Sequence, residues 1–142
     1  FVSMPCFDPN SFSDGIGQKE WAWLNGDTDR KPLLNKATRG LYPPGSTLKP
    51  MAALAILEAG VDPAERISCP GGYRLGNRFF RCLGRHGPVD MPTAIEKSCN
   101  TYFYAMSHRL GYDRIAPVAR TLGLGEDFRI SGANQRYGTI PD

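Results

Sequence analysis

A hydroxyl and an amine stand three residues apart at the start of an apolar stretch, Ser46 and Lys49 in YPPGSTLKPMAALAILEAG. On a helix, this spacing places both side chains on one face. Burial against such an apolar helix removes water from a lysine, which lowers the pKa of its ammonium group and makes a neutral amine accessible. A neutral amine can accept the proton of a neighbouring hydroxyl and turn the serine into a nucleophile. The N-terminus of the helix would add an N–H group and positive partial charge where an oxyanion forms.

A second hydroxyl lies downstream, in Ser98-Cys99-Asn100. The serine of such a motif can relay a proton between a base and a leaving amine, and the asparagine can orient a substrate amide. Each motif is common by itself: with 8 Ser and 5 Lys in the chain, S-x-x-K arises by chance about 0.3 times. A helix-capping serine beside a solvent-facing lysine is therefore an open alternative. The two motifs together favour a serine acyl-transfer site.

Helix-breaking and helix-capping residues predict the helices and strands that would hold these side chains. Pro50 lacks an N–H group and is tolerated only in a first turn, so a helix is predicted from near Ser46 to just before Gly60. A β-hairpin is predicted over residues 73–80, with a Gly76-Asn77 turn. Two or three helices follow, and their predicted N-terminal residues are Asp90, Asn100 and Asp113.

The two ends of the chain are less regular. FVSM, closed by Pro5, predicts a short edge strand. Residues 6–40 show little periodicity, and the tail after residue 124 reads as loop with at most one short strand. The chain opens abruptly and without a signal peptide, so it is expected to be a piece of a longer protein.

Composition narrows the class of protein. The chain has 142 residues, of which 41% are hydrophobic and 22% charged, and this is typical of one globular domain. No apolar run reaches the ~18 residues that a membrane span needs. The net charge is +3 and the 12 arginines are scattered, so we do not expect a nucleic-acid partner.

YPPGSTLKP and SCNTYFYAMSHRLG, together with the upstream CFDPNSF and PLLNKATRG, resemble the class B penicillin-binding proteins, and among these the transpeptidases of cell elongation. The resemblance runs in matching order from about Phe1 to Gly125, so it is far more specific than either short motif. It implies that Ser46 is the acyl-forming nucleophile, Lys49 its base, Ser98 a proton relay and Asn100 a substrate contact.

The resemblance also implies a reaction and its setting. A D-Ala-D-Ala stem peptide of peptidoglycan would acylate the serine and pass to an amine of a neighbouring stem, with no cofactor, and β-lactam antibiotics would acylate the same residue. The expected location is the periplasmic side of the bacterial inner membrane, with elongation-complex membrane proteins, including a SEDS-type glycosyltransferase, as partners. A D,D-carboxypeptidase or a β-lactamase of the same superfamily is the enzyme alternative.

The third motif of the family, Lys-Thr/Ser-Gly on a distant strand, does not occur in these 142 residues. By the resemblance, residues 1–142 are expected to be a partial transpeptidase domain, without membrane anchor, pedestal or C-terminal part, and inactive alone. The implied fold class is α+β, an antiparallel sheet flanked by helices, of which this chain carries a mostly helical portion.

Three cysteines and one histidine follow the pattern C-x12-C-x3-H-x12-C, namely Cys69, Cys82, His86 and Cys99. In the predicted hairpin, Cys82 falls opposite Gly71, so its sulfur can approach that of Cys69. Three thiolates and an imidazole suit tetrahedral zinc. A Cys69–Cys82 disulfide, which a periplasmic location would allow, and free buried thiols are the alternatives. A non-catalytic, metal-stabilised interaction lobe is thus a second possible function.

Overall fold

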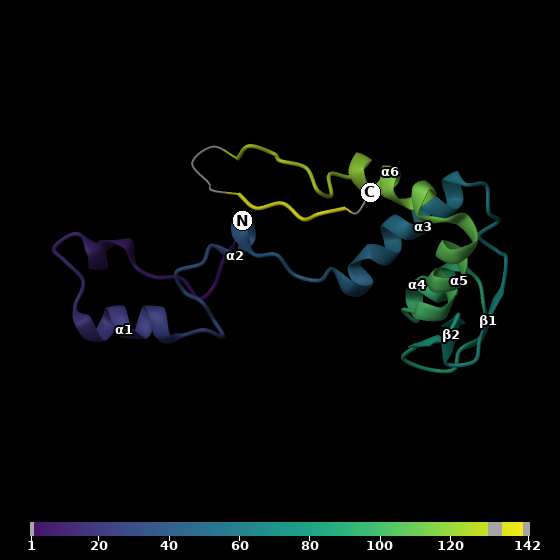
Figure 1. The fold of residues 1–142 in the computed structure, drawn as a ribbon, viewed down its shortest axis with the longest axis horizontal. Coiled ribbons are helices and arrows are strands. Elements are labelled where there is room, and N and C mark those ends of the chain that lie inside the picture. Colours follow the sequence, from purple (N-terminus) through teal and green to yellow (C-terminus); the bar gives the residue numbers. More distant parts are fainter. Residues whose placement is uncertain (1, 131–134, 141–142) are drawn as a thin grey trace. The chain divides into compact units, whose positions relative to one another are not determined.

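The computed structural model describes residues 2–130 and 135–140. Its chain forms two compact units, Phe1–Tyr42 with Glu126–Thr139 and Pro43–Gly125 with Ile140–Asp142. Helices and two small antiparallel sheets make up the fold, so the predicted α+β class is confirmed (Figure 1). All candidate site residues belong to the larger unit, 43–125.

Four helices shape the larger unit. A 3-10 turn, η2 (Gly45–Leu48), leads directly into α3 (Lys49–Glu58), and α4 (Met91–Glu96), α5 (Asn100–Leu110) and α6 (Tyr112–Thr121) follow the sheets. Pro50 lies in the first turn of α3, where its missing N–H costs no hydrogen bond. Gly60 adopts a φ of 81° just past the C-terminus of α3. The predicted helix is therefore confirmed, with its opening turn in 3-10 geometry.

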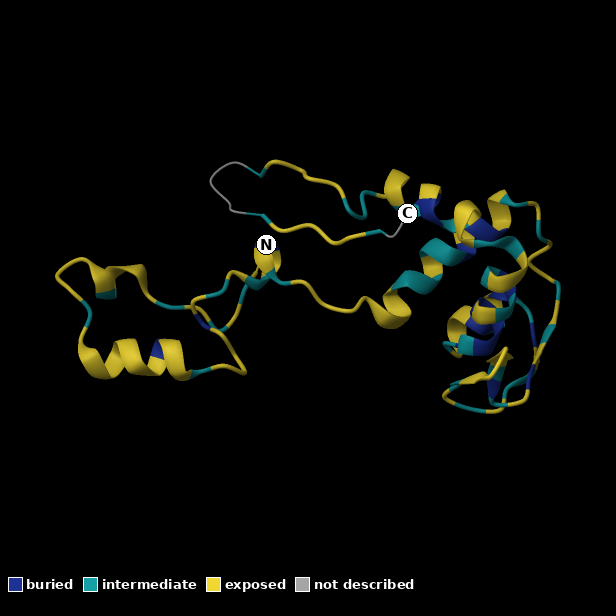
Figure 2. Ribbon diagram, viewed as in Figure 1, coloured by how far each residue is buried: buried dark blue, intermediate teal, exposed yellow. Residues whose placement is uncertain are grey.

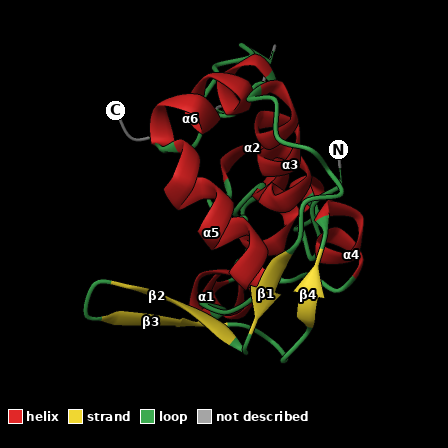
Figure 3. Ribbon diagram, turned by 90° about the vertical axis from the view of Figure 1, so that its right-hand side faces the viewer, coloured by secondary structure: helices red, strands yellow, loops and turns green. Residues whose placement is uncertain are grey.

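The strands form two pairs, shown in Figure 3: β1 (Ile67–Cys69) with β4 (Gly87–Val89), and β2 (Gly72–Leu75) with β3 (Arg78–Arg81). Leu75 pairs with Arg78, so the predicted hairpin and its Gly76-Asn77 turn are confirmed. The Cys82 N–H donates to the Gly71 oxygen over 2.9 Å, which extends the pairing as expected. The β1–β4 pair was not predicted, because three-residue strands carry too short a pattern.

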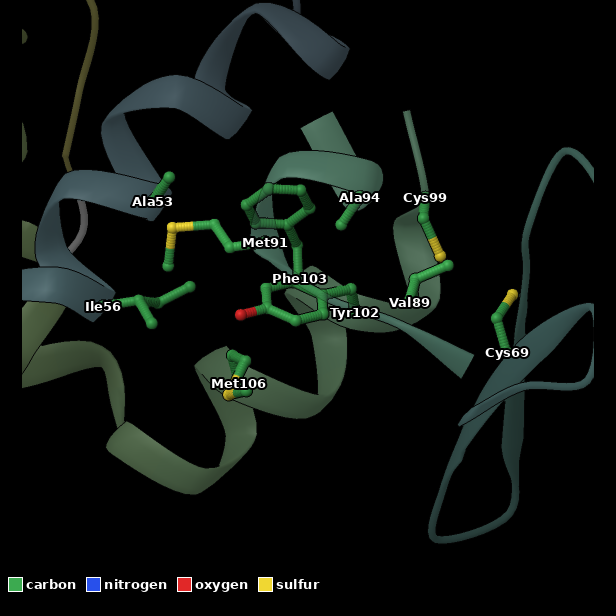
Figure 4. Packing of buried hydrophobic residues seen from close by; sticks show 10 residues of the cluster. All are labelled: Ala53, Ile56, Cys69, Val89, Met91, Ala94, Cys99, Tyr102, Phe103 and Met106. Carbon is green, nitrogen blue, oxygen red and sulfur yellow. The ribbon is translucent and has the colours of Figure 1, made fainter. Parts of the chain in front are cut away.

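Helix α5 runs through the middle of the core, where its Tyr102 and Met106 are fully buried four residues apart on one face (Figure 4). Burial of one such side chain contributes about 1.5–3 kcal/mol. Strands β1 and β4, helices α3 and α4 and the residue before α5 supply the rest of the hydrophobic core, which comprises Ala53, Ile56, Cys69, Val89, Met91, Ala94, Cys99, Tyr102, Phe103 and Met106. This packing fixes the first turn of α5, and with it the position of Asn100.

The helix starts differ in part from those predicted. Asp90 caps α4 as expected, because its carboxylate accepts from the Thr93 N–H over 3.0 Å. The residue before α5 is Cys99 rather than Asn100, which is already helical. Helix α6 begins after Gly111, whose φ of 83° turns the chain directly out of α5, and not at Asp113. The predictions for Asn100 and Asp113 were therefore wrong by one or two residues.

The smaller unit is mostly exposed (Figure 2), and within its described part the buried residues are Leu24, Pro32 and Thr38. Its elements are η1 (Pro9–Phe12), α1 (Gln18–Gly26) and α2 (Lys36–Arg39). The strand expected over FVSM is wrong for residues 2–4, since Ser3 and Pro5 accept hydrogen bonds from Lys36 instead of pairing with a strand. The possible tail strand is likewise not found over 125–130 and 135–140, and residues 131–134 lie outside the described part.

Across the described residues, no helix combines the length and apolar character needed to cross a membrane.

Candidate functional site

The two hydroxyls and the amine singled out in the sequence meet at one point of the larger unit. The Lys49 Nζ donates to the Ser98 Oγ over 2.8 Å, although 49 residues separate them. The Ser98 Oγ lies 2.9 Å from the Ser46 Oγ. Within the described part of the chain, the Lys49 amine has no direct hydrogen bond to Ser46, so its link to that hydroxyl passes through Ser98.

Asn100 completes this group. Its Oδ1 accepts a hydrogen bond from the Lys49 Nζ over 2.6 Å, and the main-chain oxygen of Ser98 accepts another over 2.6 Å. The ammonium group thus has three acceptors, the number that its three N–H bonds can satisfy. This set of contacts fixes the lysine side chain with its nitrogen against Ser98.

Local backbone geometry positions Ser98 between helices α4 and α5. Its φ is 49°, in the left-handed region that non-glycine residues rarely adopt. The N–H groups of Ser98 and Cys99 donate to Ile95 and Ala94 over 3.1 and 2.8 Å, which closes a tight turn at the end of α4. The unusual conformation is therefore held by hydrogen bonds on the side of α4 and by the buried start of α5.

Burial affects the protonation of the lysine. Desolvation lowers the pKa of Lys49 below its ordinary value of 10.5, while negative charge on Cys82 and Cys99 opposes this effect. The ring of Phe103 lies 5.9 Å from the Nζ and forms an apolar wall. A lowered pKa makes the neutral amine accessible, and the neutral amine is the form that can accept a proton.

This arrangement is chemically a hydroxyl connected to an amine base by a second hydroxyl. Serine activation requires a base within hydrogen-bond reach or one relay group away, and both distances here are below 3 Å. Ser46 lies in the opening 3-10 turn ahead of α3, where main-chain N–H groups point out of the helix. The site therefore holds a serine hydroxyl and an amine linked by a second hydroxyl, an arrangement that suits acyl transfer through a serine ester.

The three cysteines and the histidine of the spaced pattern also come together. The ligand atoms of Cys69, Cys82, His86 and Cys99 all lie within 4.8 Å of one another. The His86 Nδ1 is 3.6 Å from both the Cys69 and the Cys82 sulfurs, and the Cys82 and Cys99 sulfurs are 3.9 Å apart. All four cysteines of the chain are free thiols, so the disulfide alternative is not found.

Hydrogen bonds set the charge on this cluster. Burial raises the pKa of Cys82, but N–H groups of Thr101, Gly84 and Asn100 outweigh it and lower the pKa to about 6. Burial raises the pKa of Cys99 to about 12, and the neighbouring thiols add to this rise. At neutral pH, the cluster therefore carries negative charge on at least one sulfur, and a bound cation would stabilise it.

Asn100 contacts both the cysteine–histidine cluster and the serine site. The N–H of Asn100 donates to the Cys82 Sγ over 3.2 Å, while its side chain contacts Lys49. The Asn100 Nδ2 also donates to the main-chain oxygen of Arg81, at the end of β3, over 3.2 Å. These contacts were not predicted, because they depend on how the hairpin meets α5 and not on spacing in the chain.

All eight predicted site residues therefore fall into two adjoining groups. Residues that the sequence did not indicate include Phe103, beside the lysine, and Thr101, whose Oγ1 lies 3.2 Å from the Cys69 Sγ. Both follow Asn100 within one turn of α5. That proximity to the Ser98–Asn100 motif is the signal that could have found them.

Comparison with known proteins supports the family resemblance that the sequence motifs indicate. A sequence model described as the penicillin binding protein transpeptidase domain matches residues 1–142. The chain is 40% identical over 147 aligned residues to the peptidoglycan D,D-transpeptidase MrdA of Acinetobacter baumannii, covering 99% of this chain and 22% of that protein. The chain thus spans less than a quarter of that curated relative.

Solved structures are similar as well. PBP2 of Pseudomonas aeruginosa, in complex with WCK 5153, has a TM-score of 0.85 and 41% identity, with 99% of this chain and 33% of that chain covered. PBP2 of Helicobacter pylori, in complex with MreC, has a TM-score of 0.88 and 31% identity, with 99% and 27% covered. Penicillin-binding protein A of Mycobacterium tuberculosis, as a penicillin G acyl-enzyme, has a TM-score of 0.80 and 31% identity, with 99% and 35% covered.

Proposed function

The chain belongs to the penicillin-binding protein transpeptidase family, and from this premise we propose that it carries the serine acyl-transfer half of a peptidoglycan D,D-transpeptidase active site. The observation that carries the proposal is the continuous contact from Lys49 Nζ through Ser98 Oγ to Ser46 Oγ, at 2.8 and 2.9 Å. A capping serine beside an unrelated lysine would not require the second hydroxyl between them.

In the proposed reaction, Ser46 attacks the carbonyl of the D-Ala-D-Ala bond of a stem peptide. Its proton passes to Ser98, and that of Ser98 to the neutral amine of Lys49. The amide bond breaks, the departing D-Ala amine takes a proton back through the same relay, and an ester joins the substrate to the serine. An amine of a second stem then attacks the ester, its surplus proton returns to the serine, and the cross-link forms.

The other groups of the site have positioning roles in this proposal. Asn100 holds the lysine through its Oδ1, and the amide of its side chain is the expected contact for a substrate amide. The outward-pointing N–H groups of the opening turn before α3 are suited to a developing oxyanion. No metal or cofactor is needed for any of these steps.

The relatives support the setting that we propose for this reaction. The penicillin G acyl-enzyme of penicillin-binding protein A supports β-lactams as reagents for Ser46 here. The complex of PBP2 with MreC supports an elongation-complex protein as a partner of the whole protein. We place that protein at the periplasmic side of the inner membrane, where stem peptides are cross-linked, with a SEDS-type glycosyltransferase as a further partner.

We also propose that Cys69, Cys82, His86 and Cys99 hold a structural zinc ion. Tetrahedral zinc with bonds of about 2.3 Å to sulfur and 2.0 Å to nitrogen places its ligand atoms about 3.5 to 3.8 Å apart. The sulfur–nitrogen distances of 3.6 Å and the sulfur–sulfur distance of 3.9 Å match this requirement. The N–H of Asn100 on the Cys82 sulfur is the kind of outer contact that orients a thiolate ligand.

The experiment for the acyl-transfer proposal is an intact mass measurement before and after incubation with benzylpenicillin. We expect a single penicilloyl adduct on the wild-type chain and none on Ser46→Ala. Ser68→Ala, which changes an exposed serine of β1, is the matched control. An adduct retained in Ser46→Ala would overturn the assignment of Ser46, whereas a folded wild-type chain without an adduct would mean that residues 1–142 do not suffice for acylation.

A further inference from the structure

The β2–β3 hairpin and the loop after it carry four exposed arginines that the proposed chemistry does not use, namely Arg74, Arg78, Arg81 and Arg85. Residues 67–89 contain no Asp or Glu. Among the described residues, the salt bridges are Arg30–Asp27 and Arg109–Glu65, both outside this segment. The hairpin therefore presents several guanidinium groups that no carboxylate of the described chain neutralises.

Two of these groups are held against aromatic rings. The Arg74 guanidinium lies 5.9 Å from the centre of the Phe79 ring, and that of Arg78 lies 5.3 Å from the Phe80 ring. Such stacking uses the flat face of a guanidinium and leaves its N–H edge free for a carboxylate. Side-chain entropy is thus already reduced before any ligand binds.

An aromatic ring covers part of the exposed face of the hairpin. Phe79 is 52% exposed, and its ring lies across Gly72, where an added Cβ would come within 2.4 Å of the ring. Gly72 pairs with Arg81 and Arg74 pairs with Phe79, so these residues share one face of the pleat. On that face, the Phe79 ring is flanked by the cationic side chains of Arg74 and Arg81.

The opposite face anchors the hairpin to α5. Phe80 packs on Tyr104 with ring centres 5.3 Å apart, and the Tyr73 hydroxyl lies 2.7 Å from the His108 Nδ1. The end of β3 reaches the serine site, since the Arg81 oxygen accepts from the Asn100 side chain. The arginines are therefore mounted on a fixed element whose end borders the catalytic group.

The length of an extended stem peptide is compatible with the spacing of these arginines. Arg74 pairs with Phe79, which lies two residues along β3 from Arg81 on the same face, so the two arginines are offset by about 7 Å along the strands. An extended peptide covers about 3.3–3.6 Å per residue. A carboxylate two or three residues before the scissile D-Ala-D-Ala bond can thus lie over the hairpin while the bond lies at Ser46.

We propose that the β2–β3 hairpin is a carboxylate-recognition site for the stem peptide, with Arg81 and Arg74, which share its exposed face, as its main contacts. This inference rests on the proposed transpeptidase function. A guanidinium group binds a carboxylate with two parallel charged hydrogen bonds, which a neutral carboxamide cannot match. The site therefore distinguishes stem peptides with a free side carboxylate from those in which it is amidated.

The test compares two synthetic pentapeptides in the Ser46→Ala background, where no turnover occurs. One is N-acetyl-L-Ala-D-isoglutamate-L-Lys-D-Ala-D-Ala, and the other carries D-isoglutamine in place of D-isoglutamate. We expect the acid to bind about tenfold more tightly by NMR or calorimetric titration. Arg81→Gln and Arg74→Gln should each reduce that preference severalfold, whereas Arg114→Gln, an exposed arginine on α6, should not.

Three outcomes would overturn the inference. The first is equal affinity for the two peptides, and the second is an equal effect of Arg114→Gln. The third is displacement of the acid peptide by inorganic polyphosphate at the same concentration, which would mean a general polyanion surface. Failure of the proposed function is seen separately, because benzylpenicillin then leaves Ser46 unmodified even where all hairpin arginines are intact.

Discussion

The main-chain N–H of Asn100 donates a hydrogen bond to the Sγ of Cys82 over 3.2 Å, and the same residue accepts one from Lys49 over 2.6 Å. One residue therefore joins the cysteine–histidine cluster to the serine site. Because Cys99 lies between Ser98 and Asn100, we expect a change at the cysteine–histidine cluster to act on the turn that carries Ser98.

Metal removal should therefore loosen this turn. We expect chelation to raise amide hydrogen exchange over residues 98–101 and to slow acylation by benzylpenicillin, while exchange within α3 stays low because α3 supplies none of the four ligands. Exchange would be followed by mass spectrometry, and native mass spectrometry would report the ion itself. Cys69→Ser should reproduce the effect, and Cys6→Ser, an exposed thiol of the smaller unit, serves as the matched control.

Two results would contradict this prediction. A native mass that shows no metal at saturating zinc would remove its premise. Unchanged exchange over residues 98–101 after the ion is lost would mean that the cluster does not support the relay.

Acylation should depend on pH through Lys49. Desolvation lowers the pKa of this lysine from its usual value of 10.5, and the neutral amine is the proton acceptor. The rate of adduct formation should therefore rise with pH, with a midpoint below 10.5. Lys49→Arg keeps a permanent charge and should reduce the rate by about 10²–10⁴. A rate that is independent of pH from 6 to 10, or an Arg variant of wild-type rate, would exclude Lys49 as the base.

The same shift affects stability in a defined direction. The pKa of Lys49 is lower in the folded than in the unfolded chain, so the unfolded chain binds more protons between the two values. Stability from this group should then rise with pH across that window and be fully present above 10.5. Denaturant titrations of wild type and Lys49→Met at several pH values would isolate this contribution. A wild-type chain that loses more stability than Lys49→Met as pH rises across that window would contradict the prediction.

Ser98 should be needed even though it forms no bond to the substrate. Its hydroxyl is the group between Lys49 and Ser46, so Ser98→Ala should slow acylation by about 10²-fold or more. Thermal unfolding of the variant separates this effect from misfolding. Ser107→Ala, within α5, is the matched control and should leave the rate unchanged. Equal rates in Ser98→Ala and wild type would show that the amine reaches Ser46 by another route.

Local rules predicted much of the fold. The apolar run after Pro50, the Gly76-Asn77 turn and the Asp90 cap each act over fewer than a dozen residues, and the structure contains all three. The strand predicted over FVSM failed because strand formation depends on a partner, and the Lys36 side chain and main chain satisfy that segment instead. The helix α1 (Gln18–Gly26) was missed because Leu24 is its only buried residue, so it has no apolar stripe to detect.

The candidate site was likewise predicted in part from local patterns. Ser46 and Lys49 are neighbours along one turn, so their spacing predicted their proximity, and the alternation of the hairpin placed Cys82 near Cys69. The contacts across the two motifs depend on the packing of α5 against α3, which no local pattern encodes. Asn100 was expected as a cap and a substrate contact, but its hydrogen bonds to Cys82 and Arg81 arise only in the folded chain.

A final prediction concerns the core beneath the site. Tyr102 is fully buried, yet among the described residues its hydroxyl has no hydrogen-bond partner, and burial raises its pKa. A buried polar group without a partner costs about 1–3 kcal/mol. Tyr102→Phe should therefore leave the free energy of unfolding unchanged or raise it by about 1 kcal/mol, measured by urea titration. Tyr104→Phe, on the exposed side of α5, should have little effect. A clear loss of stability in Tyr102→Phe would contradict this prediction and would reveal a hydrogen bond from the hydroxyl to a buried water in the core.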